Sequence, residues 1–274
     1  MVSIGRVFRL TYIWRPGALA LLVVLLYGLV FWRDVLWAAA VLEEAVYGAA
    51  GLTAERAAVF GARHLDAETP VLYDIERSRY FYAKSATLDP TYPYVQHQLA
   101  RIAFLEGDYN VALWRINREF AVNPNPHPSS QYVRGLIYGY MGQYGNSIEG
   151  FRAYLEADPT NWAAVNDYAW VLLKAGRQEE ALAAIEEVIA LWPKNPWLLN
   201  SAAIAAYEVG EYERARGYAE RAAEHVRGLT KREWLVAYPG NDPRIAGDGI
   251  AALKKSILNN MHTITSARDD SAVQ

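Results

Sequence analysis

The sequence contains no cysteine, and its net charge is only −3 over 274 residues. The missing cysteines exclude disulfide bonds, thiolate catalysis, cysteine-bound zinc and acylation of a lipoprotein cysteine. Without a basic excess there is no electrostatic argument for binding nucleic acid. Hydrophobic residues make up 53% of the chain and charged residues 21%. This composition predicts a folded protein rather than a disordered one.

No group of side chains in the sequence predicts a catalytic, metal or cofactor site. A glycine-rich phosphate loop, a nucleophile elbow and a paired-histidine zinc motif are all missing from the sequence. No histidine has another three or four residues away, the spacing that would place two ligands on one helix face. We therefore expect a protein that is not an enzyme and needs no metal or cofactor; its histidines are His64, His97, His127, His225 and His262.

One long apolar run, "PGALALLVVLLYGLVFW", lies near the N-terminus at residues 16–32. After its first proline the run would extend about 24 Å as a helix, slightly less than the ~30 Å hydrocarbon core of a bilayer. Trp14 lies before the run and Trp37 after it, which suits aromatic rings at the two membrane interfaces. The run predicts a single transmembrane helix over residues 17–40.

The basic residues around the run predict its orientation. Arg6, Arg9 and Arg15 precede it, and only Arg33 follows closely. The positive-inside rule then predicts a short cytoplasmic basic leader over residues 1–16. The rest of the chain would be extracytoplasmic, in the periplasm of a bacterium or outside the cell.

Two other interpretations of the run stay open. Residues 38–40 are three alanines that offer an A-x-A cleavage site, so the run could be a signal peptide, although it is longer than the usual ~7–15 residues. Cleavage there would release the remainder as a secreted protein. The run could also be a buried helix of a soluble domain, but nothing near it in the sequence would cover all its faces.

A repeat of 34 or 35 residues runs through the middle of the chain. The glycines of four related segments mark it: Gly107, Gly142, Gly176 and Gly210. A fixed period of this length is typical of a repeat array.

If each glycine is position 15 of its unit, position 8 is Ala100, Gly135, Ala169 and Ala203, and position 20 is Ala112, Ser147, Ala181 and Ala215. Small residues at both positions let two helices of a unit approach closely. Position 32 is Pro124, Pro159 and Pro193 in the first three units, where a proline would end the second helix.

This pattern resembles the tetratricopeptide repeat family over residues 93–227. The sequence departs from the family at position 4, which is not tryptophan in any unit, and at position 27, where Glu119, Tyr154 and Val188 replace the usual alanine. The resemblance implies an all-α solenoid of four repeats. It also implies that the first helices of the repeats line a concave groove that binds a protein or peptide.

The family's groove positions fall mostly on aromatic and amide residues of this sequence. Asn166 and Asn200 occupy the same position in consecutive units, and their side chains could hydrogen-bond an extended peptide. The aromatic residues could instead pack between helices, and Trp170 and Trp197 could serve as platforms for a glycan. The predicted partner-binding residues are Tyr94, His97, Arg101, Phe104, Tyr132, Tyr140, Asn166, Trp170, Lys174, Trp197, Asn200 and Tyr207.

Helices are also predicted on both sides of the four repeats. Residues 41–92 would form a helical stalk and a degenerate N-terminal half-repeat, in which Thr53 caps a helix. Residues 228–264 would form a C-terminal capping helix region, because a terminal repeat must cover its stacking face. Residues 265–274 are predicted to be a disordered tail.

Together these features predict a non-catalytic, membrane-tethered scaffold or adaptor that binds a protein or peptide partner, with cell-envelope assembly as one context. The alternatives are a structural subunit of a membrane enzyme or of a secretion or pilus complex, and a secreted repeat module.

Overall fold

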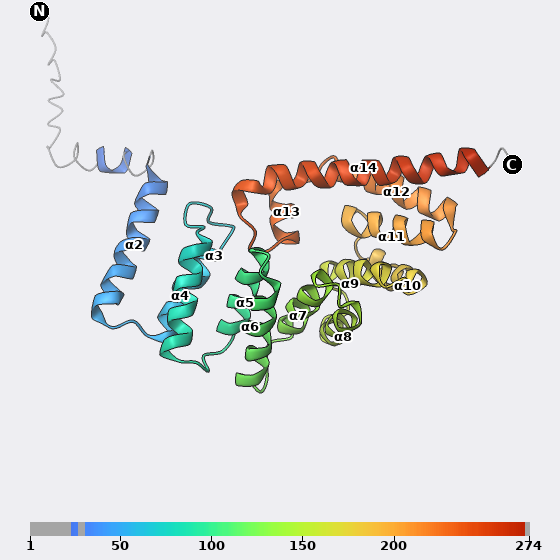
Figure 1. Cartoon of the computed structure of the whole chain (residues 1–274). Helices are drawn as coiled ribbons and strands as arrows, with labels where there is room; N and C mark the ends of the chain where they lie inside the picture. Colours follow the sequence, from blue (N-terminus) through green and yellow to red (C-terminus); the bar gives the residue numbers. More distant parts are fainter. Residues whose placement is uncertain (1–22, 27–30, 272–274) are drawn as a thin grey trace, which may run out of the picture. The chain divides into compact units, whose positions relative to one another are not determined.

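The computed structural model describes residues 23–26 and 31–271, and every regular element in these ranges is helical (Figure 1). The prediction of an all-α fold is confirmed. The chain divides into two compact units, Met1–Gly51 and Leu52–Gln274.

The N-terminal unit contains α2, Trp32–Ala50, which ends at Gly51 with a positive φ of 111°. Residues 17–22 and 27–30 of the predicted transmembrane helix, residues 17–40, lie outside the described residues, as does the predicted leader, residues 1–16. Within the described ranges, no helix combines the length and the apolar character that crossing a bilayer requires. Residue 40, the predicted end of the span, lies inside α2.

The second unit is a series of antiparallel helical hairpins (Figure 1). The second helix of each hairpin packs on the first helix of the next, and the first helices of successive repeats also contact one another. This arrangement places the first helices side by side on one face of the array. The hairpins are α3 (Ala54–Leu65) with α4 (Ile75–Leu88), α5 (Val95–Leu105) with α6 (Tyr109–Val122), α7 (Ser129–Tyr140) with α8 (Tyr144–Leu155), α9 (Trp162–Lys174) with α10 (Gln178–Ile189), and α11 (Pro196–Glu208) with α12 (Tyr212–Val226).

The turn glycines and the small residues do what the repeat pattern predicts. The position-15 glycines all have φ between 73° and 84°, the left-handed conformation that favours glycine at a helix end. The small residues between the paired helices are buried, and the Ser147 hydroxyl donates to the Gly135 carbonyl at 2.6 Å. A Cβ on Gly150 would lie 2.9 Å from Gly135 Cα, so these two backbones touch.

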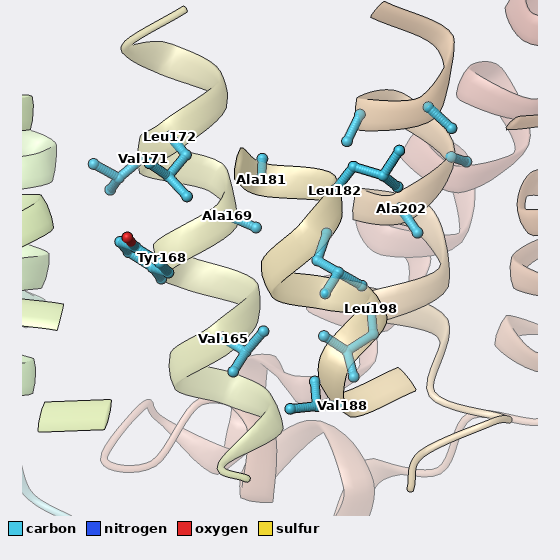
Figure 2. Packing of buried hydrophobic residues seen from close by; sticks show 14 of the residues in the cluster. Val165, Tyr168, Ala169, Val171, Leu172, Ala181, Leu182, Val188, Leu198 and Ala202 are labelled. Carbon is cyan, nitrogen blue, oxygen red and sulfur yellow. The ribbon is translucent and has the colours of Figure 1, made fainter. Parts of the chain in front are cut away.

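The largest apolar core joins α9, α10 and α11 (Figure 2). Val165 and Leu172 of α9 meet Leu182 of α10 and Leu198 of α11, and all four side chains are buried. Because each hairpin exposes an apolar face until its neighbour covers it, this packing fixes the order and spacing of the repeats.

The hairpin of α3 and α4 packs on α5 at the start of the array. The Thr53 hydroxyl accepts the backbone N–H of Arg56 at 3.2 Å, so the predicted cap of α3 is confirmed. Asp74 caps α4 in the same way, accepting the N–H of Arg77 at 2.9 Å.

Beyond the last hairpin lie α13 (Lys231–Ala237), a 3-10 turn (η1, Pro243–Ile245) and the long helix α14 (Ala246–Ser271) (Figure 1). Ile257 of α14 is buried against Leu199 and Val226, so α14 covers the end of the array. The helix continues past residue 264, where the sequence predicts a disordered tail. No proline or glycine interrupts residues 265–271, and the Thr265 hydroxyl bonds back to the Met261 carbonyl at 2.9 Å within the helix.

Candidate functional site

A cavity of about 550 Å³ lies along the face formed by the first helices of the repeats. Residues of α5, α7, α9 and α11 form most of its wall, and residues 237–241 form the rest. The lining residues are Tyr94, His97, Arg101, Phe104, Leu105, Ser129, Tyr132, Val133, Leu136, Tyr140, Trp162, Ala163, Asn166, Asp167, Trp170, Leu173, Trp197, Asn200, Ser201, Ile204, Ala237, Tyr238, Pro239 and Asn241.

All of the predicted partner-binding residues except Lys174 and Tyr207 line this cavity. Lys174 is the exposed last residue of α9, beyond the cavity. Tyr207 packs on the core and against the Tyr212 ring, with centroids 5.5 Å apart. Both residues lie near the C-terminal ends of their helices, where the helix has passed the cavity.

The wall formed by residues 237–241 is absent from the sequence-based prediction. Three hydrogen bonds hold the loop of residues 238–242 across the array. The Arg101 guanidinium donates to the Pro239 carbonyl at 3.0 Å and the Tyr73 hydroxyl donates to the Gly240 carbonyl at 2.7 Å. At the other end, the Trp197 ring N–H donates to the Tyr238 hydroxyl at 3.0 Å. The chain's own loop therefore bridges the first and last repeats and closes one side of the groove.

Aromatic rings form a continuous part of the cavity wall. The ring centroids of Phe104 and Tyr140 are 5.1 Å apart, and those of Tyr140 and Trp170 are 5.3 Å apart. These separations are typical of favourable aromatic contacts. Tyr140 is nevertheless 54% exposed, so its ring is open to a ligand.

Asp167 is the carboxylate of this cavity, and sequence reasoning missed it. The Tyr132 hydroxyl donates to Asp167 Oδ2 at 2.5 Å, and the Asn166 amide lies 3.4 Å from Oδ1. Burial raises the pKa of Asp167 to about 6, although both hydrogen bonds act to lower it. A signal was present in the sequence: α5, α7, α9 and α11 contain no other acidic residue except Glu208, the last residue of α11.

His97 belongs to the packed wall of the cavity. It is 1% exposed, its ring stacks on Tyr94 with centroids 4.0 Å apart, and Nδ1 lies 3.0 Å from Ser130 Oγ. Burial lowers the pKa of His97 to about 2, with smaller contributions in the same direction from Arg101 and His127. The imidazole is therefore neutral near pH 7 and orders the start of α5 and α7 rather than supplying a charge.

Glu119, a departure from the family pattern, caps α5 from the neighbouring helix. Its carboxylate accepts the backbone N–H groups of Tyr94 and His97 at 3.1 and 3.2 Å, and the Asn123 amide at 3.1 Å. Tyr94 itself has φ of 69° and gives α5 no side-chain cap. The buried carboxylate satisfies backbone donors at the positive end of the α5 dipole, which explains an acid at this position.

The two asparagines predicted to bind a peptide are already partly engaged. The Ser201 hydroxyl donates to Asn166 Oδ1 at 2.8 Å, and the Asn260 amide of α14 donates to Asn200 Oδ1 at 3.0 Å. Each carbonyl oxygen keeps a second lone pair for a ligand. In the described part of the chain, no group of three or more His, Asp and Glu side chains could hold a metal ion.

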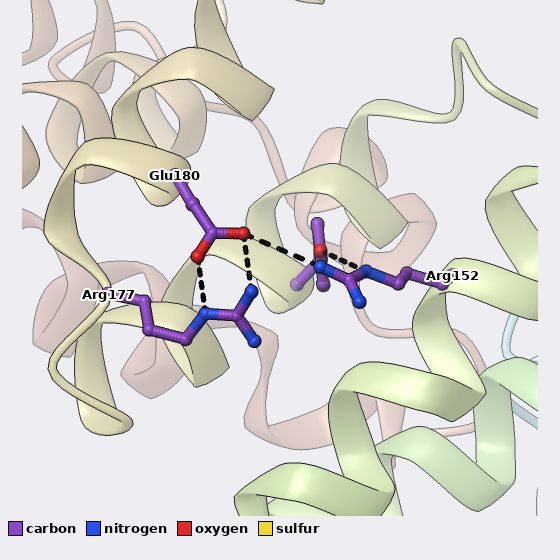
Figure 3. A network of polar contacts seen from close by, with 4 residues as sticks. Arg152, Arg177 and Glu180 are labelled. Atoms are coloured by element: carbon purple, nitrogen blue, oxygen red, sulfur yellow. Dashed lines mark hydrogen bonds and ion pairs between the residues drawn. The ribbon is translucent and has the colours of Figure 1, made fainter.

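Ion pairs on the second helices link neighbouring repeats. Arg177 makes two hydrogen bonds of 2.5 Å to Glu180, and Arg152 of the preceding repeat lies 3.4 Å from the same carboxylate (Figure 3). Glu180 is exposed, and such surface pairs contribute little to stability. The array thus presents an ionic outer surface and an aromatic cavity on the face of its first helices.

Comparison with known proteins agrees with this geometry. Residues 132–196 match the family model of the tetratricopeptide repeat. Residues 132–196, which run from α7 to the start of α11, are therefore a segment of tetratricopeptide repeats. No curated protein sequence matches the chain. A MamA crystal structure aligns with a TM-score of 0.53 and 16% identity, covering 68% of this chain and 94% of that protein. A structure described as YrrB, a tetratricopeptide repeat protein with an unusual peptide-binding site, aligns with a TM-score of 0.50 and 16% identity, covering 56% of this chain and 79% of that one. At these identities the likeness shows the fold alone.

Proposed function

We propose that this tetratricopeptide repeat chain is a non-catalytic scaffold that holds a segment of a partner protein in the cavity, while its N-terminal segment anchors it in a membrane. The observation that supports partner binding most directly is the exposed aromatic wall around Tyr140. Repeats of this family generally serve protein–protein interaction, and aromatic anchors in partly enclosed pockets contribute most to such interfaces.

The dimensions of the cavity favour a short segment over a folded domain. A volume of about 550 Å³ is in the range of sites that enclose a small ligand or a few side chains. The loop of residues 238–242 covers one side, so a bulky partner would have to displace it. Trp197 is 8% exposed and its ring N–H is bonded to Tyr238, which disfavours a role as a glycan platform.

The surface of α2 supports the membrane anchor. Trp32 and Trp37 are 52% and 51% exposed, and Leu42 and Val46 are 66% and 55% exposed. Apolar side chains of this size on one helix favour contact with lipid or with another membrane helix. Together with the apolar run before α2, this favours a single span. The arginines that precede the run favour an extracytoplasmic position for the repeats, and cell-envelope assembly is a context that fits it.

A second function is favoured by Trp114 on α6. This side chain is 55% exposed, and the guanidinium of Arg115 lies 4.6 Å from its ring centroid. An exposed tryptophan flanked by arginine suits a subunit contact on the second helices. It would fit a structural subunit of a membrane enzyme or of a secretion complex.

Site-specific photocrosslinking of the full-length chain in native membranes tests these functions. We expect a benzoylphenylalanine that replaces Tyr140 to crosslink to a partner protein. The additional substitution Trp170→Ala should abolish this crosslink. Lys174→Ala is the matched control, because this residue lies on the same helix but outside the cavity, and it should leave the crosslink intact. Crosslinking from position 114 alone would refute partner binding in the cavity and support the second function. An intact mass below 30.7 kDa in the membrane extract, by the mass of about forty residues, would refute the anchor.

A further inference from the structure

Asp167 is a carboxylate without a basic partner. Within the described residues its contacts are the Tyr132 hydroxyl and the Asn166 amide, and neither carries a positive charge. Arg101 is the one arginine or lysine among the residues that line the cavity, and it is bonded instead to the Gln98 amide oxygen at 2.9 Å and to the Pro239 carbonyl. Removing a carboxylate from water without a counter-charge is unfavourable.

The aromatic wall lies close to this carboxylate. Trp170 follows Asp167 by three residues on α9, which places both side chains on the same side of the helix. Burial is the main cause that raises the pKa values of Tyr140 and Tyr238, and the negative charge of Asp167 raises both further, so both hydroxyls are within its electrostatic reach. Tyr140 and Trp170 are neighbours, with ring centroids 5.3 Å apart. A carboxylate beside exposed aromatic faces is the combination that binds an organic cation, through charge pairing and cation–π contact.

We propose that the partner segment inserts a basic side chain into the cavity, with its charge on the Asp167 carboxylate and its apolar stem against Tyr140 and Trp170. This inference rests on the proposed function and specifies the chemistry of the segment that the cavity receives. Arginine fits better than lysine, because a planar guanidinium can stack on an aromatic ring while it donates to the free lone pairs of the carboxylate.

The identity of Asp167 supports a role in binding rather than in packing. If the residue served only to accept the Tyr132 hydroxyl, a neutral asparagine would accept the same bond without the cost of a buried charge. The charge itself is therefore the feature that needs an explanation, and a basic ligand supplies one. The Asp167 side chain is only partly buried, so the carboxylate can stay ionised until the ligand replaces water.

Selection from a displayed library of random heptapeptides on the purified full-length chain tests the proposal. We expect the selected peptides to be rich in arginine and lysine and to lose binding to the Trp170→Ala variant. Synthetic copies of the best binder would then be measured with its key arginine and with citrulline, which has nearly the same shape but no charge. Citrulline should weaken binding at least tenfold in the wild type.

Two variants separate the charge from the fold. Asp167→Asn keeps an acceptor for Tyr132 and should reduce the preference for arginine over citrulline to less than twofold. Glu149→Gln removes one negative charge from the exposed face of α8 and should leave the preference unchanged. If circular dichroism shows that the Asp167→Asn chain is unfolded, the comparison of arginine and citrulline peptides on the wild type alone decides whether the cavity binds a basic side chain.

The outcomes distinguish this inference from the proposed function. Selected peptides that need Trp170 but bind equally well with arginine or citrulline would refute the proposal of a basic side chain, while the proposed scaffold function would still hold. An arginine preference that survives Asp167→Asn would also overturn it. If no peptide binds in a manner that depends on Trp170, the proposed function fails first and the inference with it.

Discussion

The unpaired charge of Asp167 predicts that the free protein is stabilised when this residue is neutralised. The pKa of Asp167 is raised from 3.8 to about 6 in the folded chain, mainly because burial disfavours the ionised carboxylate. A folded-state pKa above the unfolded value means that the folded state binds the proton more tightly. The contribution of this group to the free energy of unfolding therefore falls as pH rises from about 4 to about 6, and the full cost is present above that window.

The size of the effect follows from the shift. About two pKa units correspond to roughly 3 kcal/mol, and the residual solvent exposure of Asp167 in the cavity reduces this to about 2 kcal/mol. Asp167→Asn keeps the acceptor for Tyr132 and removes the charge. We expect the variant to be more stable than the wild type by about 2 kcal/mol at pH 8, and by about half as much at pH 5, where half of the penalty is already relieved.

Urea unfolding followed by circular dichroism at pH 5, 6, 7 and 8 measures this difference. Subtracting the two proteins at each pH cancels every titration that they share, including that of His97. A variant that is less stable than the wild type at pH 8, or a difference that does not change with pH, would refute the reasoning. Either result would mean that the Asp167 carboxylate is stabilised by a charge that the geometry does not contain, or by more contact with solvent than its partial exposure provides.

Three further substitutions test the packing around the cavity. The pKa of His97 is lowered from 6.5 to about 2, so the stability contributed by the neutral ring is lost as pH falls below about 6.5. In urea unfolding, the wild type should therefore lose about 2 kcal/mol of stability through this residue between pH 7 and pH 5, and the His97→Gln variant should not show that loss. Glu119→Ala removes the carboxylate that caps α5 and should cost about 2 kcal/mol or more in thermal unfolding, and a loss below about 0.5 kcal/mol would contradict the capping role. Gly150→Ala places a Cβ against the backbone of Gly135 and should cost about 2 kcal/mol, whereas Gly145→Ala on the same helix meets nothing within 4 Å and should be neutral or slightly stabilising.

The repeat array could be predicted from the sequence because its determinants are local. A turn glycine, a small residue and a proline each constrain the backbone within a few residues, and their recurrence at 34 or 35 residues identifies the helical hairpin. The positions of Ala100 and Ala112 show this well. Both are buried completely between α5 and α6, as the pattern of small residues predicts.

Local signals could not predict how much of each side chain is free for a ligand. His97 and Trp197 occupy groove positions, yet they are 1% and 8% exposed because neighbouring rings and the 238–242 loop cover them. Asp167 was missed for a related reason. The family pattern places its neighbour Asn166 in the groove and does not specify the next residue, although that residue is the one acid in the middle of a first helix.

The bridge across the array was not predictable from periodicity, since it depends on contacts between distant parts of the chain. Arg101 reaches a carbonyl 138 residues away, and Tyr73 one 167 residues away. In a simple repeat array each unit contacts only its neighbours, so its ends are energetically almost independent. Here the loop of residues 238–242 joins the N-terminal hairpin and first repeat to the last repeat. A ligand that contacts both Asp167 and Tyr238 would therefore bind a groove whose width is already set, which lowers the ordering cost of binding. The same closure limits the site to segments slender enough to enter beside the loop, and it makes the chain's own C-terminal region part of its specificity.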